Sequence, residues 1–140
     1  MELAWTERLS VGNAMLDTEH KQLVDMVNGI ERAIRARDCL ALLQAFKPFE
    51  DYVRAHFENE ARVAQSVNFP FVQHALEHHY VLEELRSMGD ELVANDGRWS
   101  ESAAEHYSYF LGEWLIEHLL QEDMLMKSAL QKLPYNFKPD

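Results

Sequence analysis

Apolar side chains recur along most of this 140-residue chain at alternating spacings of four and three residues. That spacing is typical of helices packed in a bundle, because it keeps one stripe of each helix apolar. No stretch alternates apolar and polar residues as a half-buried strand does, and glycine and proline are sparse. Four stretches show the pattern and predict helices over residues of about 17–36, 40–65, 70–93 and 101–131.

The connections between these stretches are short, so consecutive helices must run antiparallel. The sequence therefore predicts an all-α fold, an up-down-up-down antiparallel four-helix bundle, as one domain over residues 1–140. Residues 1–15, which include Trp5, are expected to form an arm laid over the bundle. Residues 134–140 are expected to be an irregular tail.

A few residues predict where the helices begin or are interrupted. Asp17 or Thr18 can cap the first helix. Pro48 lacks a backbone N–H, so it should either kink the second helix or mark its true start. Gly112 weakens the fourth helix by about 1 kcal/mol relative to alanine. We expect Gly112 to make room for Trp114 or for a neighbouring backbone.

Polar side chains of metal-binding types interrupt the apolar stripes of all four predicted helices. They are five histidines and two carboxylates: His20, His56, Glu60, His74, His78, His118 and Asp123. A single histidine at an inward position is more often a hydrogen-bonded core residue than a metal ligand. Seven such groups in one core would bury a costly polar cluster with few partners, so together they predict a metal site.

The spacing of these residues indicates how they are directed. His56 and Glu60 are four residues apart, as are His74 and His78, so each pair points the same way from its helix. Asp123 follows His118 by five residues, about 140° around an α-helix, so this aspartate must reach in from the side. The other two histidines lie off the inward stripes and are not expected to bind metal. His106 is expected at the surface, and His79 either at the surface or directly behind the ligands.

The donor set also indicates which metal the site suits. Five imidazoles and two carboxylates suit a pair of iron ions better than metals that demand only oxygen ligands. The chain contains no Glu-x-x-His, the motif that a carboxylate-rich ferritin-like site repeats on two helices.

Composition narrows the possible partners and compartments. The net charge of −11 argues against nucleic acid, whose phosphates require a basic surface, and against anionic membrane surfaces. Cys39 is the single cysteine, which excludes an internal disulfide and thiolate clusters. Neither a signal peptide nor an apolar run long enough for a bilayer is evident, so a cytoplasmic location is expected.

The motifs resemble those of single-domain bacterial hemerythrins from Trp5 to about residue 130. The matching segments read SVGNAMLDTEHKQL, HFENE, HALEH and WLIEHLLQED. The resemblance implies a non-haem di-iron centre (Fe²⁺/Fe³⁺) with an oxo or hydroxo bridge. It implies one iron on His74, His78 and His118, a second on His20 and His56, and bridging by Glu60 and Asp123.

The function that the resemblance implies is reversible binding of dioxygen, for storage, delivery or detoxification, rather than enzyme catalysis. One alternative is an oxygen- or redox-sensing module, although no signalling segment is present in the chain. A di-iron redox enzyme acting on peroxide or nitric oxide is a further alternative. The sequence identifies no protein partner.

Four residues depart from the common family pattern: Ala61, Ala64, Gln121 and Met126. The inward positions of the fourth helix are predicted to be Tyr107, Leu111, Trp114, His118, Gln121 and Leu125. An inward Gln121 and a small Ala64 could admit water and shorten the retention of dioxygen. Alternatively, Gln121 turns outward and Ala64 is packed over. Three aromatic residues near the cluster, Phe57, Phe110 and Trp114, are expected to belong to the core.

Overall fold

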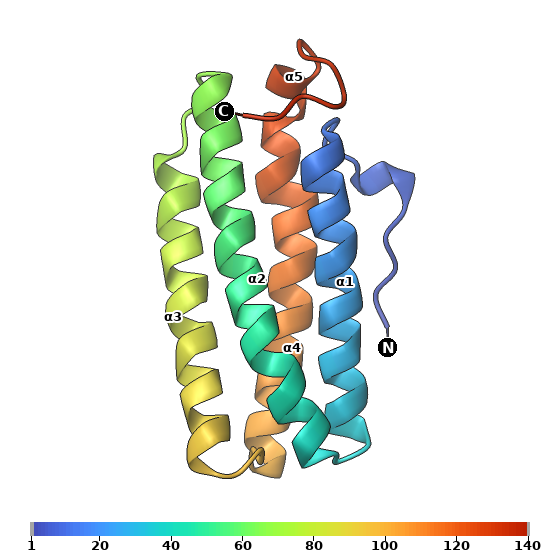
Figure 1. The fold of residues 1–140 in the computed structure, drawn as a ribbon, viewed down its shortest axis with the longest axis vertical. Helices are drawn as coiled ribbons and strands as arrows, with labels where there is room; N and C mark the ends of the chain where they lie inside the picture. The colour runs from blue at the N-terminus through green and yellow to red at the C-terminus, as the bar shows by residue number, and fades with distance from the viewer. Residues whose placement is uncertain (1, 140) are drawn as a thin grey trace.

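The computed structural model describes residues 2–139, apart from the side chains of Glu122 and Asp123. Four long helices run up and down beside one another (Figure 1). They are α1 (Ala14–Arg35), α2 (Cys39–Ser66), α3 (Val72–Ala94) and α4 (Glu101–Glu117). The described residues contain no strand, and the prediction of an all-α four-helix bundle is confirmed. Among these residues no helix combines the length and apolar character needed to cross a bilayer.

Side-chain caps set where the helices begin. The side chain of Asn13 accepts a hydrogen bond from the Leu16 N–H, so α1 starts at Ala14, ahead of the predicted caps Asp17 and Thr18. The prediction of those two residues as caps is wrong. Asp38 caps α2 by accepting from the N–H of Ala41, and Ser100 caps α4 in the same way.

Asp17 has a different role, because its buried carboxylate joins three segments. It accepts hydrogen bonds from the Val11 N–H at 2.9 Å, the Ser10 hydroxyl at 2.5 Å and the Tyr135 hydroxyl at 2.8 Å. The C-terminal tail is also held by a bond from the Ala14 N–H to the Tyr135 carbonyl. These contacts fix Ser10, Val11 and the C-terminal tail against the start of α1.

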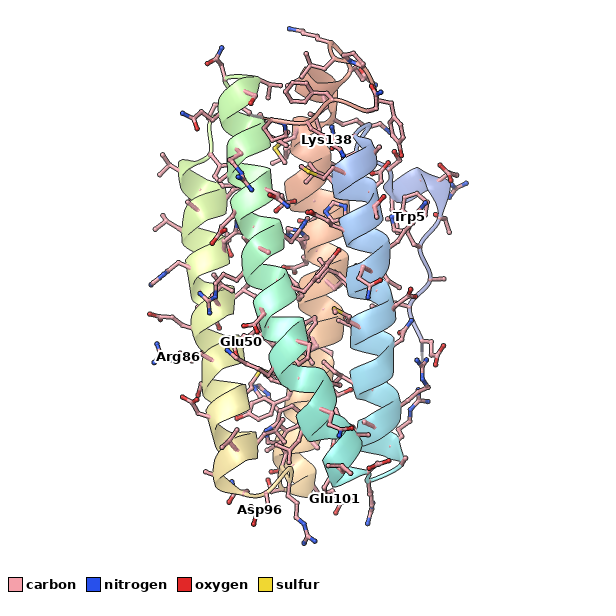
Figure 2. The ribbon with its side chains drawn as sticks, viewed as in Figure 1. Trp5, Glu50, Arg86, Asp96, Glu101 and Lys138 are labelled. Atoms are coloured by element: carbon pink, nitrogen blue, oxygen red, sulfur yellow. The ribbon has the colours of Figure 1, made fainter. Side chains whose placement is uncertain are left out.

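The N-terminal arm follows the outer side of α1 (Figures 1 and 2). The backbone of Leu3 exchanges two 2.8 Å hydrogen bonds with the side-chain amide of Asn28. The Lys21 ammonium lies 4.4 Å from the centre of the Trp5 ring, a cation–π contact. A short 3-10 helix, η1 (Glu7–Leu9), then leads into α1.

Pro48 in α2 and Gly112 in α4 differ from what the sequence predicted for them. Pro48 lies well inside α2, which begins at Cys39, so this proline does not mark the start of the helix. Both Pro48 and Gln44, whose carbonyl loses its partner, are exposed to solvent. A Cβ atom added at Gly112 would meet nothing within 4 Å. The expectation that Gly112 makes room for a neighbour is therefore wrong.

The helical path changes after α4, where the sequence predicts one continuous helix to residue 131. A π-helical segment, η2 (His118–Glu122), is followed by the 3-10 segment η3 (Asp123–Met126) and by α5 (Lys127–Leu130). A π turn contains one residue more than an α turn, so the inward positions move on by one residue. Gln121 and Leu125 are exposed, while Met126 is fully buried. The predicted inward positions of Gln121 and Leu125 are therefore wrong.

The apolar core consists of two clusters with the polar site between them. The larger cluster includes Leu23, Phe49, Val53 and Leu85. The smaller one consists of Val11, Leu16, Val63, Ala64, Met126 and Leu130. Along α1, His20 lies between Leu16 of the smaller cluster and Leu23 of the larger one. The polar layer is thus enclosed by hydrocarbon on both sides.

The open surroundings of Gly112 generate a stability prediction. Gly112→Ala should raise the free energy of unfolding by about 0.5–1 kcal/mol, because alanine has less backbone entropy to lose. Urea denaturation followed by circular dichroism measures the change. The control is Gly97→Ala, where φ is +88° and the new Cβ would lie 2.5 Å from the Cys39 carbonyl oxygen. Gly97→Ala should destabilise the protein, and a destabilised Gly112→Ala would contradict our account of that position.

The tail contact predicts a specific dependence of stability on pH. The hydrogen bond to Asp17, partial burial and the charges of Asp17 and Glu7 raise the pKa of Tyr135 to about 12. Because this folded-state pKa exceeds the ordinary value of 10, the contribution is complete below pH 10 and disappears as pH rises toward 12. Urea unfolding across this window should show a smaller loss of stability in Tyr135→Phe than in the parent. Equal losses in both proteins would rule out this contribution.

Candidate metal centre

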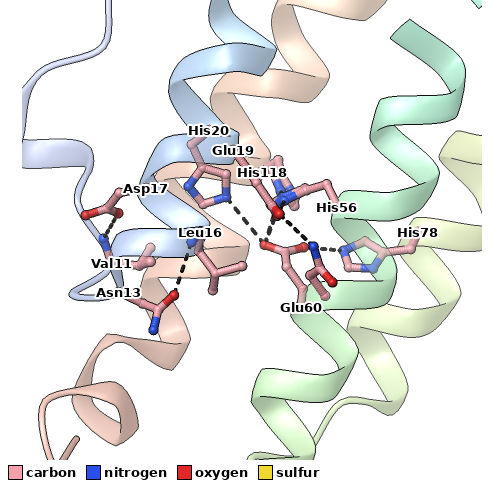
Figure 3. A network of polar contacts seen from close by, with 11 residues as sticks. Val11, Asn13, Leu16, Asp17, Glu19, His20, His56, Glu60, His78 and His118 are labelled. Carbon is pink, nitrogen blue, oxygen red and sulfur yellow. Dashed lines mark hydrogen bonds and ion pairs between the residues drawn. The ribbon is translucent and has the colours of Figure 1, made fainter. Parts of the chain in front are cut away.

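The predicted ligands converge from three helices and the π segment. His20 lies on α1, His56 and Glu60 on α2, His74 and His78 on α3, and His118 opens η2. All six are buried. Figure 3 shows that the imidazoles of His20, His118 and His78 point toward the carboxylate of Glu60.

Glu60 is the centre of this convergence. Its Oε2 lies 3.4 Å from His20 Nε2, 3.2 Å from His56 Nε2 and 3.4 Å from His118 Nε2. Its other oxygen, Oε1, lies 3.4 Å from His78 Nε2. One donor atom from each of His20, His56, Glu60 and His118 lies within 4.8 Å of the other three. The two carboxylate oxygens thus face different histidines.

These distances suit a metal ion. Imidazole nitrogens bind such ions at about 2.0–2.1 Å, so neighbouring ligand atoms in one coordination shell lie roughly 3.0–3.4 Å apart. The contacts around Glu60 Oε2 fall in this range, as does the 3.1 Å separation of His56 Nε2 and His118 Nε2. The donors therefore fit a cation without large movements of the helices.

His74 lies one turn before His78 on α3. The ring centre of His74 is 6.1 Å from that of His78, and it lies closer to the ring centres of Phe69, at 5.5 Å, and Phe71, at 5.1 Å. His118, which the resemblance paired with His74 and His78, lies closest to His56 and Glu60. The structure thus places His74 next to His78, at one edge of the cluster.

The side chain of Asp123, the seventh predicted ligand, lies outside the described residues. Its backbone begins η3, directly after the π segment that starts at His118. A π turn closes a hydrogen bond between residues five apart, so position 123 lies about one turn beyond position 118. The 140° offset of a regular α-helix therefore does not apply here.

Aromatic rings hold the imidazoles in place and exclude water. The ring of Phe57 stacks on His78, with 3.7 Å between centres and 2° between planes, and lies 5.5 Å from the ring of His118. The Trp114 ring centre is 5.6 Å from that of His118. The prediction that these aromatics are core residues is confirmed for Phe57 and Trp114, which are buried, whereas Phe110 is partly buried and packs against the edge of the same core.

A carboxylate that sequence reasoning missed holds the outer nitrogen of His56. Glu19 Oε1 lies 2.7 Å from His56 Nδ1, and Glu19 Oε2 accepts a 2.6 Å hydrogen bond from the Asn59 amide. Burial lowers the pKa of His56, but the charge of Glu60 and hydrogen bonds to Glu19 and Glu60 outweigh it and raise this pKa to about 9. Metal-bound histidines usually donate their other N–H to such a group, which is the signal that could have identified Glu19.

The two remaining histidines are exposed, as predicted. His79 Nε2 lies 3.1 Å from Glu83 Oε1 on the outer side of α3. His106 lies on α4 beside Tyr107. Neither belongs to the buried cluster.

Comparison with known proteins agrees with this arrangement. The family model described as the hemerythrin HHE cation binding domain matches residues 11–130. The chain belongs to the hemerythrin family. A bacteriohemerythrin of Pseudomonas aeruginosa is 22% identical over 122 residues, covering 86% of this chain and 76% of that relative. A hemerythrin-like protein of Naegleria gruberi is 26% identical over 130 residues, covering 90% of this chain and 92% of the relative.

Solved structures show the same fold. The crystal structure of a wild-type hemerythrin superposes with a TM-score of 0.80 at 22% sequence identity. The superposition covers 91% of this chain and 97% of the hemerythrin.

The central position of Glu60 predicts a large effect of its charge on metal binding. Glu60→Gln should lower the affinity for Co²⁺ at least about tenfold, because an amide removes the charge and turns a donor toward the imidazoles. Titration followed by visible absorption measures this affinity. The matched control His79→Gln changes an exposed residue of α3 and should leave the affinity unchanged. Equal affinities of parent and Glu60→Gln would show that Co²⁺ binds elsewhere.

Proposed function

We propose that this hemerythrin-family protein binds dioxygen reversibly at a pair of iron ions, for its storage, delivery or detoxification. The proposed ligands are the seven predicted residues: His20, His56, Glu60, His74, His78, His118 and Asp123. The observation that carries the proposal is the convergence of four buried donors within 4.8 Å of one another.

The donor set favours iron. The described ligands are rich in imidazole, with a carboxylate at their centre, which suits borderline divalent metals. Iron bound in this layer would supply the electrons for reversible binding of dioxygen. The names of the bacteriohemerythrin relatives support the same assignment.

The two oxygens of Glu60 support a pair of ions rather than one. Oε2 faces His20, His56 and His118, whereas Oε1 faces His78. A carboxylate that presents its oxygens to two sets of ligands is placed to bridge two cations. Asp123, one π turn beyond His118, is the proposed second bridge.

The surroundings of the site keep it dry. The smaller apolar cluster covers one side of the polar layer, and Phe57 and Trp114 cover another. Ala64 is fully buried in the smaller cluster, and Gln121 is exposed. Weak retention of dioxygen was expected from an inward Gln121 together with open space at Ala64, and the exposed Gln121 and the packed Ala64 match the alternative instead. Weak retention is therefore not part of this proposal. Exclusion of water protects the site from side reactions during reversible binding.

Anaerobic loading with Fe²⁺ followed by exposure to air tests the function. A visible absorption band should appear with air and vanish on removal of dioxygen, over repeated cycles. Irreversible bleaching, or turnover of added peroxide or nitric oxide, would instead favour the enzyme alternative. Absence of iron binding would contradict the proposal.

The proposed role of Asp123 predicts a change in metal stoichiometry. Asp123→Ala should reduce the iron content from about two ions per chain toward one, since a bridging carboxylate contributes to both positions. Elemental analysis after gel filtration measures the ratio. Asp51→Ala, which removes an exposed carboxylate paired with Lys47, is the control and should retain the parental content. Unchanged stoichiometry in Asp123→Ala would exclude this residue as a necessary ligand.

A further inference from the structure

A chain of hydrogen bonds runs from the protein surface to the buried ring of His56. At its outer end the guanidinium of the exposed Arg62 donates to Asn59 Oδ1. The Asn59 amide donates at 2.6 Å to Glu19 Oε2, and the other oxygen of Glu19 lies 2.7 Å from His56 Nδ1. Glu19 comes from α1 and the other three residues come from α2. This series of hydrogen bonds therefore crosses the interface between α1 and α2.

The guanidinium of Arg62 sets the donor-to-acceptor direction of all these hydrogen bonds. A guanidinium can only donate hydrogen bonds, so Arg62 requires the oxygen of the Asn59 amide. The NH₂ of Asn59 must then face Glu19, whose ionised carboxylate can only accept. The remaining partner of Glu19 must donate, so His56 carries a proton on Nδ1.

The direction of these hydrogen bonds determines how Nε2, the nitrogen of His56 that faces the cluster, can act. When Nδ1 donates to a carboxylate, Nε2 is the ring nitrogen whose lone pair a cation can take, displacing any proton held there. His56 Nε2 is the atom that lies 3.1 Å from His118 Nε2 and 3.2 Å from Glu60 Oε2. The lone pair is thereby directed into the cluster.

We infer that Glu19 is a positioning residue for the metal centre, oriented by Asn59 and Arg62. It holds His56 in the tautomer that binds a cation through Nε2. The inference rests on the proposed function and adds three residues that bind no metal themselves. Side-chain exposure of Glu19 is 15%, against 0% for His56, so this carboxylate links the buried layer to the surface.

The substitution Glu19→Gln tests the direction of the hydrogen bonds between Arg62 and His56. Asn59 keeps its orientation because Arg62 can only donate, so the introduced glutamine must turn its oxygen to Asn59 and its NH₂ to His56. His56 then accepts at Nδ1 and carries its proton on Nε2, which removes a lone pair from the cluster. The affinity for Co²⁺, measured by visible absorption, should fall about 10–100-fold, as for other partners of metal-binding histidines.

A double substitution separates hydrogen-bond direction from charge and packing. In Glu19→Gln with Asn59→Asp, the new aspartate accepts from both Arg62 and the glutamine NH₂. The glutamine oxygen then returns to the His56 Nδ1–H, and the net charge equals that of the parent. The Co²⁺ affinity and the absorption spectrum should recover most of the way to the parental values. Glu58→Gln removes an exposed carboxylate next to Asn59 and should have no effect.

Two results would overturn the inference while leaving the proposed function intact. One is an unchanged affinity in Glu19→Gln, and the other is a double variant that binds no better than Glu19→Gln. Circular dichroism of the metal-free variants checks that each is folded, so that lost affinity reports the site. Failure of the parent protein itself to bind Co²⁺ or Fe²⁺ would instead contradict both the inference and the proposed function.

Discussion

The buried carboxylate of Glu60 lies against imidazoles from α1, α2, α3 and the π segment that follows α4. A carboxylate is costly to bury unless polar partners surround it, and here imidazole nitrogens do so. Because these partners come from every part of the bundle, the four elements must meet at one level. The two apolar clusters above and below then keep water from this level.

This arrangement also explains why the donors are close enough for chemistry. Helix packing alone would place apolar side chains at these positions, as it does at Leu16 and Leu23 on either side of His20. Replacing one layer of hydrocarbon by histidines and a glutamate creates a small polar volume inside a rigid shell. Rings such as Phe57, stacked on His78, limit how far the imidazoles can turn. Ligands held in this way lose little conformational freedom when a cation binds.

Periodicity predicted most of the fold and the buried site residues, because α1, α2 and α3 are regular helices. Their inward positions repeat as expected, and the predicted ligands on them are all buried. The fourth element departs from the prediction after His118, since a π turn adds one residue and exposes Gln121. The five-residue spacing of His118 and Asp123 matches the five-residue repeat of a π turn. On a regular α-helix, the same spacing would place Asp123 about 140° around the helix from His118.

Contacts between helices were beyond the reach of the sequence. Glu19 and Asn59 meet because α1 and α2 are aligned at one particular level, which periodicity along either helix does not specify. The cap of α1 was also missed: Asn13 caps the helix, and the carboxylate of Asp17 instead accepts a hydrogen bond from the distant Tyr135.

Diffraction from crystals of the iron-loaded protein, recorded at the iron absorption edge, can locate the metal relative to Glu60 and its histidines. We expect anomalous peaks inside the bundle, within about 2.0–2.2 Å of the Nε2 atoms of His20, His56 and His118 and of a Glu60 oxygen. Peaks confined to surface carboxylates, or an iron-free interior after loading, would contradict this expectation.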